Sequence, residues 1–291
     1  GGTDEQGAFG VTVCTFNVLA EALEPTGCAV SFDARKDGLL QEILRSQAEI
    51  VCLQEVDHFQ DFFRPVLEGH GYEGYFVPKT KKPKGSANVT EGQAIFVRRD
   101  RLHVERAMCW TSIDLAEKKF QKLRSSWMKQ TYTGALRLEQ VFGTAEALQV
   151  VPQVVLGLFL RPKGQAAPFL VTNMHLKSRV KEEQLPAGMD YTAFKHFQLE
   201  HFLSAAAAAA EQYAPGTSVL CCGDMNLCLL GDPGAAQVVG KQGFQDTGAT
   251  SAGGTARSPV DFILARSAPG TIVAQAALEL PAAIDYTQQL P

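Results

Sequence analysis

Paired cysteines are the first feature that this sequence lacks. Its seven cysteines are an odd number, and no two are spaced as Cys-x-x-Cys, the pattern typical of zinc and thiol–disulfide sites. Cys14, Cys52 and Cys221 lie inside apolar, strand-like runs, where a thiol packs as a small hydrophobic group. We therefore expect buried, reduced thiols in an intracellular protein, cytoplasmic in the first place, with mitochondrial or nuclear residence as the alternatives.

Long apolar runs are also missing. No stretch approaches the roughly 20 residues of a membrane-spanning helix, so we expect no transmembrane helix and no membrane partner. Residues 1–10 are rich in glycine and polar side chains, which indicates a flexible lead-in rather than a signal peptide. The sequence does not begin with Met, which leaves an upstream segment open.

An excess of positive charge is absent as well. The 27 Lys and Arg residues face 31 Asp and Glu residues, a formal net charge of −4, so a polyanion would have to be held by a local basic patch. Residues 79–84 and 118–124 are candidate patches, although lysine-rich segments are more often solvated faces. Trp110 and Trp127 are candidates for stacking on a base, with core packing as the alternative.

The rest of the chain alternates strand-like and helix-like segments, and 45% of its 291 residues are hydrophobic, enough for a large core. Apolar runs predict strands at residues 11–16, 50–53, 93–97, 154–160, 169–174, 219–222 and 260–264, the fourth and fifth as an antiparallel pair. Periodicity predicts helices over residues 33–47, 59–67 and 189–212, although Pro65 disturbs the second because proline lacks a backbone donor. This mixture predicts a sandwich of mixed sheets with helices outside, as one domain over residues 11–291.

Polar side chains stand at the ends of several predicted strands. They are Asn17, Glu55, His175, Lys177, Asp224 and Asn226, and Asp261 is an acid within a further strand. Strand ends are rigid and open onto loops, so functional groups gather there. Hard oxygen ligands with few imidazoles and no thiolates suit Mg²⁺ or Mn²⁺ rather than Zn²⁺. The set predicts phosphoryl transfer, in which a metal polarises the phosphate, an acid orients water and donors stabilise the equatorial oxygens.

Each of these residues also has a structural interpretation. The strand-end asparagines and Asp224 could be ordinary turn residues. A histidine near a strand end, such as His175, is more often a satisfied hydrogen-bond partner, and Asp261 could cap an element or pair with an arginine. Glu55 is harder to explain in this way. A carboxylate that follows a Val-Cys-Leu run needs a cation or a metal if it is buried.

Six short strings follow one another in the chain. They are Phe-Asn-Val-Leu-Ala at residues 16–20, Cys-Leu-Gln-Glu-Val-Asp at 52–57, Glu-Gly-Gln-Ala-Ile-Phe at 91–96, Thr-Asn-Met-His-Leu-Lys at 172–177, Gly-Asp-Met-Asn at 223–226 and Val-Asp-Phe-Ile at 260–263. In this order they resemble the endonuclease/exonuclease/phosphatase superfamily. The Asn-Val-Leu-Ala and Glu-Val-Asp versions resemble the branch that holds nocturnin and the carbon-catabolite-repressor-type deadenylases. The resemblance runs from Phe16 to about Pro281, nearly the whole chain.

The resemblance implies a fold and a metal site. The fold is an α/β, four-layered sandwich in which two packed mixed β-sheets are flanked by helices. Glu55 would be the main Mg²⁺ ligand, assisted by Asn17, and Mn²⁺ would be able to substitute. Asp224 would orient or deprotonate the attacking water, and Asn226 and His175 would stabilise the charge that develops at phosphorus.

The resemblance also implies a substrate. Asp261 would help to hold the constellation, and Lys177 and Arg179 would contact phosphate. The implied substrates are adenylate-containing RNA, attacked at the 3′ end of poly(A), and an adenine dinucleotide, through the 2′-phosphate of NADP(H). A sphingomyelinase or a DNA-repair nuclease fits the strings less well. The rival of another class is a non-catalytic RNA-binding or scaffold protein that kept the fold.

Two strings of the family are not found in this sequence. The family ends on a Ser-Asp-His string whose histidine is catalytic, whereas this chain ends at Pro291, shortly after residues 277–281, the stretch that usually leads into it. We expect that the C-terminal tail was trimmed, rather than that this version of the family is inactive. The domain would then lack its last strand, and its activity would depend on the trimmed tail. A Thr-Trp string of the family is replaced by the Gly/Ala/Ser/Thr loop at residues 250–255, which puts adenine recognition there in question.

Overall fold

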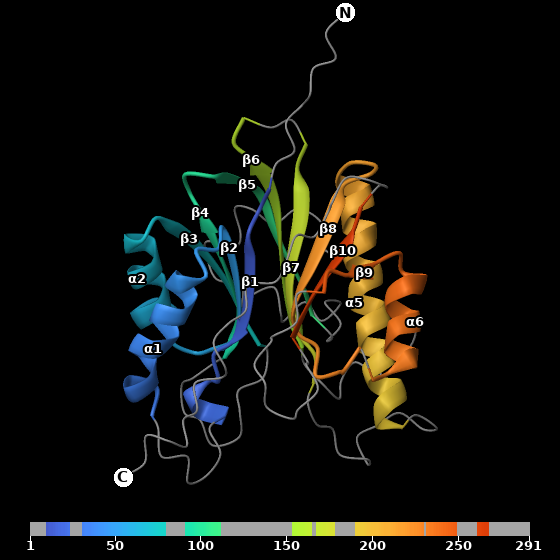
Figure 1. Ribbon diagram of the computed structural model, residues 1–291, viewed down its shortest axis with the longest axis horizontal. Helices are drawn as coiled ribbons and strands as arrows, with labels where there is room; N and C mark the ends of the chain where they lie inside the picture. The colour runs from blue at the N-terminus through green and yellow to red at the C-terminus, as the bar shows by residue number, and fades with distance from the viewer. Residues whose placement is uncertain are drawn as a thin grey trace, which may run out of the picture.

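Two β-sheets packed face to face, with helices outside each of them, organise the chain (Figure 1). The computed structural model describes residues 10–23, 31–79, 91–111, 153–164, 167–177, 190–229, 231–248 and 261–267. The layers run from α1 and α2 through the two sheets to α5 and α6. The predicted four-layered α/β sandwich is therefore confirmed. The predicted lead-in, residues 1–10, lies outside the described residues except for Gly10.

Sheet A has four strands in the order β1-β2-β4-β3. Their bounds are Val13–Asn17 for β1, Ile50–Val56 for β2, Tyr72–Pro78 for β3 and Gly92–Arg98 for β4. β1 and β2 are parallel, and β4 pairs antiparallel with both of its neighbours. Because β1 and β2 run the same way, with Asn17 opposite Gln54, their carboxyl ends lie at one edge of the sheet.

Sheet B has six strands in the order β5-β6-β7-β8-β10-β9. Their bounds are Leu102–Thr111 for β5, Val154–Pro162 for β6, Phe169–His175 for β7, Ser218–Asp224 for β8, Gln245–Asp246 for β9 and Asp261–Arg266 for β10. β7 and β8 are parallel, and the other neighbours are antiparallel. The predicted antiparallel pair is confirmed as β6 and β7.

The helices cover the outer faces of the sheets. They are α1 (Phe32–Arg45), α2 (Arg64–Gly69), α5 (Tyr191–Tyr213) and α6 (Pro233–Lys241), with a short 3₁₀ turn at Glu21–Leu23 and a π-helical turn at Phe59–Phe63. The helix predicted over residues 59–67 is thus divided into a π turn and α2. Pro65 lies in the first turn of α2, where its missing N–H has no partner to lose. No helix in the described part combines the length and apolar character that crossing a bilayer requires.

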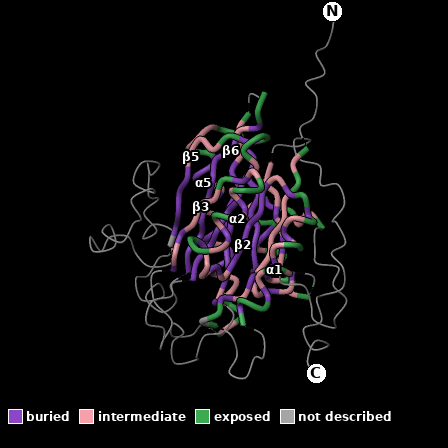
Figure 2. Tube along the Cα trace, turned by 90° about the vertical axis from the view of Figure 1, so that its left-hand side faces the viewer, coloured by how far each residue is buried: buried purple, intermediate pink, exposed green. Residues whose placement is uncertain are grey.

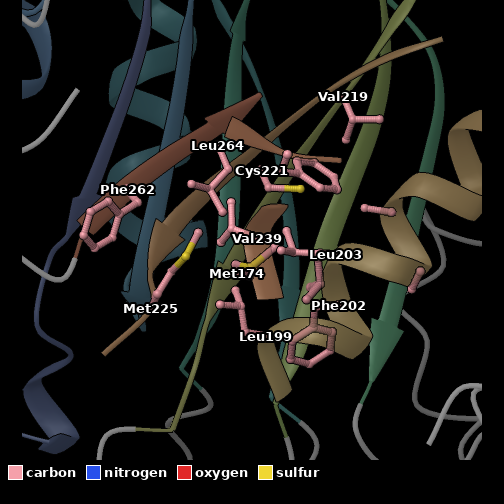
Figure 3. Packing of buried hydrophobic residues seen from close by; sticks show 14 of the residues in the cluster. Met174, Leu199, Phe202, Leu203, Val219, Cys221, Met225, Val239, Phe262 and Leu264 are labelled. Atoms are coloured by element: carbon pink, nitrogen blue, oxygen red, sulfur yellow. The ribbon is translucent and has the colours of Figure 1, made fainter. Parts of the chain in front are cut away.

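Three apolar clusters fill the spaces between the layers, and Figure 2 shows the strands largely in the colour of buried residues. One cluster lies between the sheets, one between sheet A and its helices, and one between sheet B and α5 with α6. Figure 3 shows Leu199, Phe202 and Leu203 of α5 packed in this last cluster. Trp110 belongs to it as well and is only 2% exposed, so of the two roles considered for Trp110 core packing is confirmed and base stacking is excluded. Trp127 lies outside the described residues.

Candidate active site

The predicted site residues meet where the two sheets face each other. Parallel pairing places His175, at the end of β7, opposite Asp224, at the end of β8. β10 runs antiparallel to β8, so that its first residue, Asp261, is also opposite Asp224. Sheet A supplies Asn17 and Glu55 from the ends of its own parallel strands. Residues from distant parts of the sequence therefore converge because two pairs of parallel strands end side by side.

Asn17 joins the two halves of the site. Its side-chain nitrogen Nδ2 donates to Glu55 Oε1 at 3.0 Å and to Asp224 Oδ2 at 3.1 Å, across the two sheets. Its oxygen Oδ1 accepts from the Leu19 backbone N–H at 3.0 Å. The amide therefore presents its nitrogen to the carboxylates. Direct metal coordination by Asn17, which stays a prediction, would require the amide to turn over.

Glu55 has an unusual backbone and an unsatisfied side chain. Its φ of 57° lies in the left-handed region, and the pairing of β2 with β4 is irregular between Leu53 and Val56. Such a conformation costs about 1–3 kcal/mol in a residue other than glycine, so the surrounding structure must impose it. Its Oε2 is buried and has no hydrogen-bond partner among the described residues. A buried carboxylate oxygen without a donor is a site that a cation would satisfy.

His175 lies between the two carboxylates. Its Nε2 is 3.7 Å from Glu55 Oε1 and 3.8 Å from Asp224 Oδ2. Burial, with help from the charges of Lys79 and Lys177, holds the pKa of His175 well below its ordinary value. The imidazole is therefore neutral at pH 7, where it can donate a hydrogen bond without carrying charge.

Asp224 and Asn226 form a tight turn at the end of β8. The Asn226 backbone N–H donates to Asp224 Oδ1 at 2.8 Å, and Asn226 Nδ2 donates to the Leu176 carbonyl at 2.9 Å. Burial raises the pKa of Asp224, although the bonds from Asn17 and Asn226 oppose the shift. A carboxylate with a raised pKa is a better base towards water. The Asn226 amide is used here to tie β8 to the end of β7, and its predicted contact with phosphate stays a prediction.

Asp261 is the third acid of the site. Burial, followed by the charge of Asp224 opposite it, raises the pKa of Asp261 to about 7. Its Oδ1 is buried without a hydrogen-bond partner in the described part of the chain. Asp224 and Asp261 are therefore neighbouring carboxyl groups that resist being ionised together.

The sequence analysis missed a buried ion pair beside these acids. Lys79 Nζ donates to Glu91 Oε1 at 2.7 Å, and the two residues are only 8% and 6% exposed. Burial, followed by the charge of Lys79, lowers the pKa of Lys177, and the charges of Glu91 and Glu55 oppose the shift. The two residues meet because the β3–β4 register that pairs Pro78 with Gly92 continues to them, and this register could not be read from the sequence.

Several further predictions fall outside the described residues. Arg179, the second predicted phosphate contact, is among them, as are residues 80–84 of the first basic stretch and the second basic stretch, 118–124. The loop at residues 250–255 and the stretch at residues 277–281 are outside as well.

The donor set of this site fits a hard cation with few protein ligands. Within the described ranges, no three His, Cys, Asp or Glu side chains gather closely enough to hold an ion. Glu55 and Asp224 share a single amide donor, and Glu55 keeps a free carboxylate oxygen. Mg²⁺ is bound in this manner, by one or two carboxylates with water and phosphate oxygens completing the shell.

The sequence matches known proteins over most of its length. The pattern of the Endonuclease/Exonuclease/phosphatase family matches residues 14–284. Carbon catabolite repressor protein 4 homolog 1 of Arabidopsis thaliana is 41% identical over 106 residues, which cover 33% of this chain and 18% of that protein. Nocturnin of Drosophila melanogaster is 28% identical over 208 residues, or 68% of this chain and 24% of that protein. These matches thus cover about a quarter or less of the relatives' own length.

Solved structures show the same fold. The human Nocturnin catalytic domain with bound sulfate superimposes with a TM-score of 0.59 at 22% identity, covering 86% of this chain and 80% of that domain. The residues matched by the family pattern include both strand-end carboxylates and the amide that they share. The chain belongs to the endonuclease/exonuclease/phosphatase family.

Proposed function

We propose that this protein is a Mg²⁺-dependent phosphohydrolase of the deadenylase type, which removes adenylate from the 3′ end of poly(A). The observation that carries the proposal is the Glu55 carboxylate. It is held at a strained position by its strand, it shares the Asn17 amide with Asp224, and one of its oxygens has no protein partner in the described part.

The site residues divide the reaction between them. Mg²⁺ bound at Glu55 would supply the positive charge that neutralises phosphate oxygens. Asp224, oriented by Asn17, accepts a proton from water as the water oxygen bonds to phosphorus. The bond from phosphorus to the 3′ oxygen of the preceding nucleotide breaks, this oxygen leaves with the shortened RNA and takes up a proton from solvent, and AMP is released. Neutral His175 donates towards a phosphate oxygen, and Lys177 pairs with its charge.

The substrate part of the proposal rests on charge and on the motif strings. Lys79 is already paired with Glu91 and Lys195 bonds the Asn226 carbonyl, so we assign the incoming phosphate to Lys177. The net charge of −4 makes this local positive charge the means of holding RNA. The 2′-phosphate of NADP(H) presents a similar adenosine-linked phosphate and is the alternative substrate.

The test compares the purified full-length protein with its Glu55→Gln variant on labelled oligo(A), with Mg²⁺ or with EDTA. We expect AMP release only with Mg²⁺, and a loss of at least about 1,000-fold in Glu55→Gln because the metal-binding charge is removed. Glu73→Gln, an exposed glutamate on β3, is the matched control and should behave as wild type.

A parallel assay measures phosphate released from NADP(H). Release of phosphate without AMP from oligo(A) would assign the dinucleotide as substrate. If neither product forms and Glu55→Gln binds Mg²⁺ as tightly as wild type in calorimetry, the non-catalytic alternative replaces the enzyme.

A further inference from the structure

Helix α5 turns three polar side chains towards the site. Tyr191, Lys195 and Gln198 are spaced four and three residues apart, so they share one face of the helix. The buried side chains of the helix are otherwise mostly apolar, for example Phe194 and Leu199. The three residues form a polar stripe, and each of them bonds to the backbone that follows β7 or β8.

The stripe holds two strand ends by their peptide groups. Lys195 Nζ donates to the Asn226 carbonyl at 2.5 Å. The Tyr191 hydroxyl donates to the Lys177 carbonyl at 3.3 Å, and the Lys177 N–H donates to Gln198 Oε1 at 3.4 Å. The Lys195 ammonium also lies 4.4 Å from the centre of the Tyr191 ring, which fixes its position by a cation–π contact. The bond from a charged donor is the strongest of these.

Asn226 is held in its turn by three hydrogen bonds. Its φ of 48° lies in the left-handed region, which asparagine enters more readily than most side chains, so the bonds rather than the residue type fix the conformation. Its N–H is bonded to Asp224, its Nδ2 to Leu176 and its carbonyl to Lys195. Without Lys195 the carbonyl loses its charged donor, and the turn that orients the Asp224 carboxylate can relax.

Sheet A repeats the arrangement on the other side of the site. Arg35 of α1 is 5% exposed and donates to the carbonyls of Val18 and Leu19, both at 2.9 Å. Leu19 has a φ of 54°, and its N–H is the donor that orients Asn17. In each half, a cation from the covering helix thus bonds the carbonyl of a left-handed residue, which is Leu19, two positions after Asn17, in one half and Asn226 itself in the other.

We propose that Lys195 is a positioning residue for phosphoester hydrolysis, which acts by fixing the Asn226 peptide and through it the Asp224 carboxylate. The inference rests on the proposed function. Lys195 bonds a backbone carbonyl and none of the reacting atoms, so its effect is on the geometry of the turn.

The test uses Lys195→Met and Lys195→Arg, with Lys241→Met as the control because Lys241 is a lysine bonded to α5 at the surface, through Glu200. We expect Lys195→Met to lower kcat by about 10–100-fold, the cost of a small misplacement of a reacting group. KM should stay within about threefold, since substrate contacts are retained. Lys195→Arg should recover most of kcat, and Lys241→Met should match wild type.

Hydrogen exchange gives a readout that is independent of activity. Amides in residues 223–229 should exchange faster in Lys195→Met than in wild type, while those of β6 should not change. The inference is overturned if Lys195→Met keeps kcat within about twofold, or if Lys195→Arg is as impaired as Lys195→Met. If wild type itself hydrolyses neither oligo(A) nor NADP(H), the proposed function fails. Unchanged exchange in residues 223–229 then overturns the positioning role on its own.

Discussion

At the scale of single residues, Asp261 couples the site to the stability of the fold. In the unfolded chain its carboxyl group ionises near its ordinary pKa of 3.8, whereas burial and Asp224 raise the pKa to about 7 in the folded protein. The native state therefore keeps a proton that the unfolded state has lost between about pH 4 and pH 7. The free energy of unfolding therefore falls as pH rises through this window. Above about pH 7 the full cost of ionising the buried Asp261 carboxyl group is present.

Asp261→Asn should remove this penalty. We expect a nearly unchanged free energy of unfolding at pH 4 and an increase of roughly 1–3 kcal/mol at pH 8, because an amide cannot ionise. Urea unfolding in EDTA measures both values. Asp37→Asn, at an exposed position on α1, is the control. An equal loss of stability at both pH values would show that Asp261 is held by contacts rather than kept neutral by burial.

Part of the site could be predicted at this scale. Asn17, Glu55 and Asp224 are recognisable because each is a polar residue where an apolar strand ends. The neutral state of His175 could not be predicted, since it depends on burial by distant segments. The use of the Asn226 amide on a backbone carbonyl was equally hidden, because it depends on the distance between two strands.

At the scale of the elements, the backbone of β8 passes close to that of β7 at Gly223. Its φ is 143°, and a Cβ there would overlap the carbonyl oxygen of Met174. Backbone cannot yield as a flexible side chain can. Glycine at this position therefore lets β8 run close to β7 and end with Asp224 opposite His175.

Gly223→Ala should disturb both stability and the site. We expect a loss of about 3 kcal/mol or more from overlap and backbone strain, measured by urea unfolding. Gly240→Ala, in α6 with open space around it, should instead change stability by less than about 1 kcal/mol, in the stabilising direction. A Gly223→Ala protein as stable as wild type would mean that the two strands separate without cost.

The elements themselves were predictable where the sequence pattern is regular. β6 and β7 followed from apolar runs joined by a turn. β5 did not, because its pairing with β6 shifts between Val104 and Arg106 and the shift breaks the alternation of apolar and polar residues. The helix predicted over residues 59–67 contains a π turn, which the period of an α-helix does not reveal.

At the scale of the whole molecule, a buried polar bridge joins the sheets. Gln54 Nε2 donates to Asn173 Oδ1 at 2.7 Å, and Asn173 Nδ2 donates to the carbonyls of Leu53 and Ala94 at 2.7 and 2.8 Å. Gln54 and Asn173 are fully buried. Gln54 directly precedes Glu55 in the chain, and Asn173 lies two positions before His175. The bridge therefore fixes the register of one sheet on the other beneath the site.

Asn173→Leu removes the hydrogen bonds of the bridge while a side chain still fills the same place in the core. We expect a loss of about 2–4 kcal/mol, because two backbone carbonyls lose a buried donor, together with weaker phosphoester hydrolysis. Denaturant unfolding and the AMP-release assay measure the two effects. Gln245→Leu, at an exposed position on the edge strand β9, is the control and should leave both nearly unchanged. Wild-type stability of Asn173→Leu would contradict a structural role for the bridge.

The division of the chain into two sheets also sets the order in which the site can form during synthesis. Sheet A is made of strands from the first 98 residues, and every strand of sheet B comes later in the chain. Asn17 and the Asp224 carboxylate that it bonds are 207 positions apart. A ribosome therefore exposes the half that carries Glu55 long before the half that carries Asp224. A nascent chain that ends before Asp224 carries only half of the site. The hydrogen bond between Asn17 and Asp224 is therefore among the last long-range contacts that the folding chain can form.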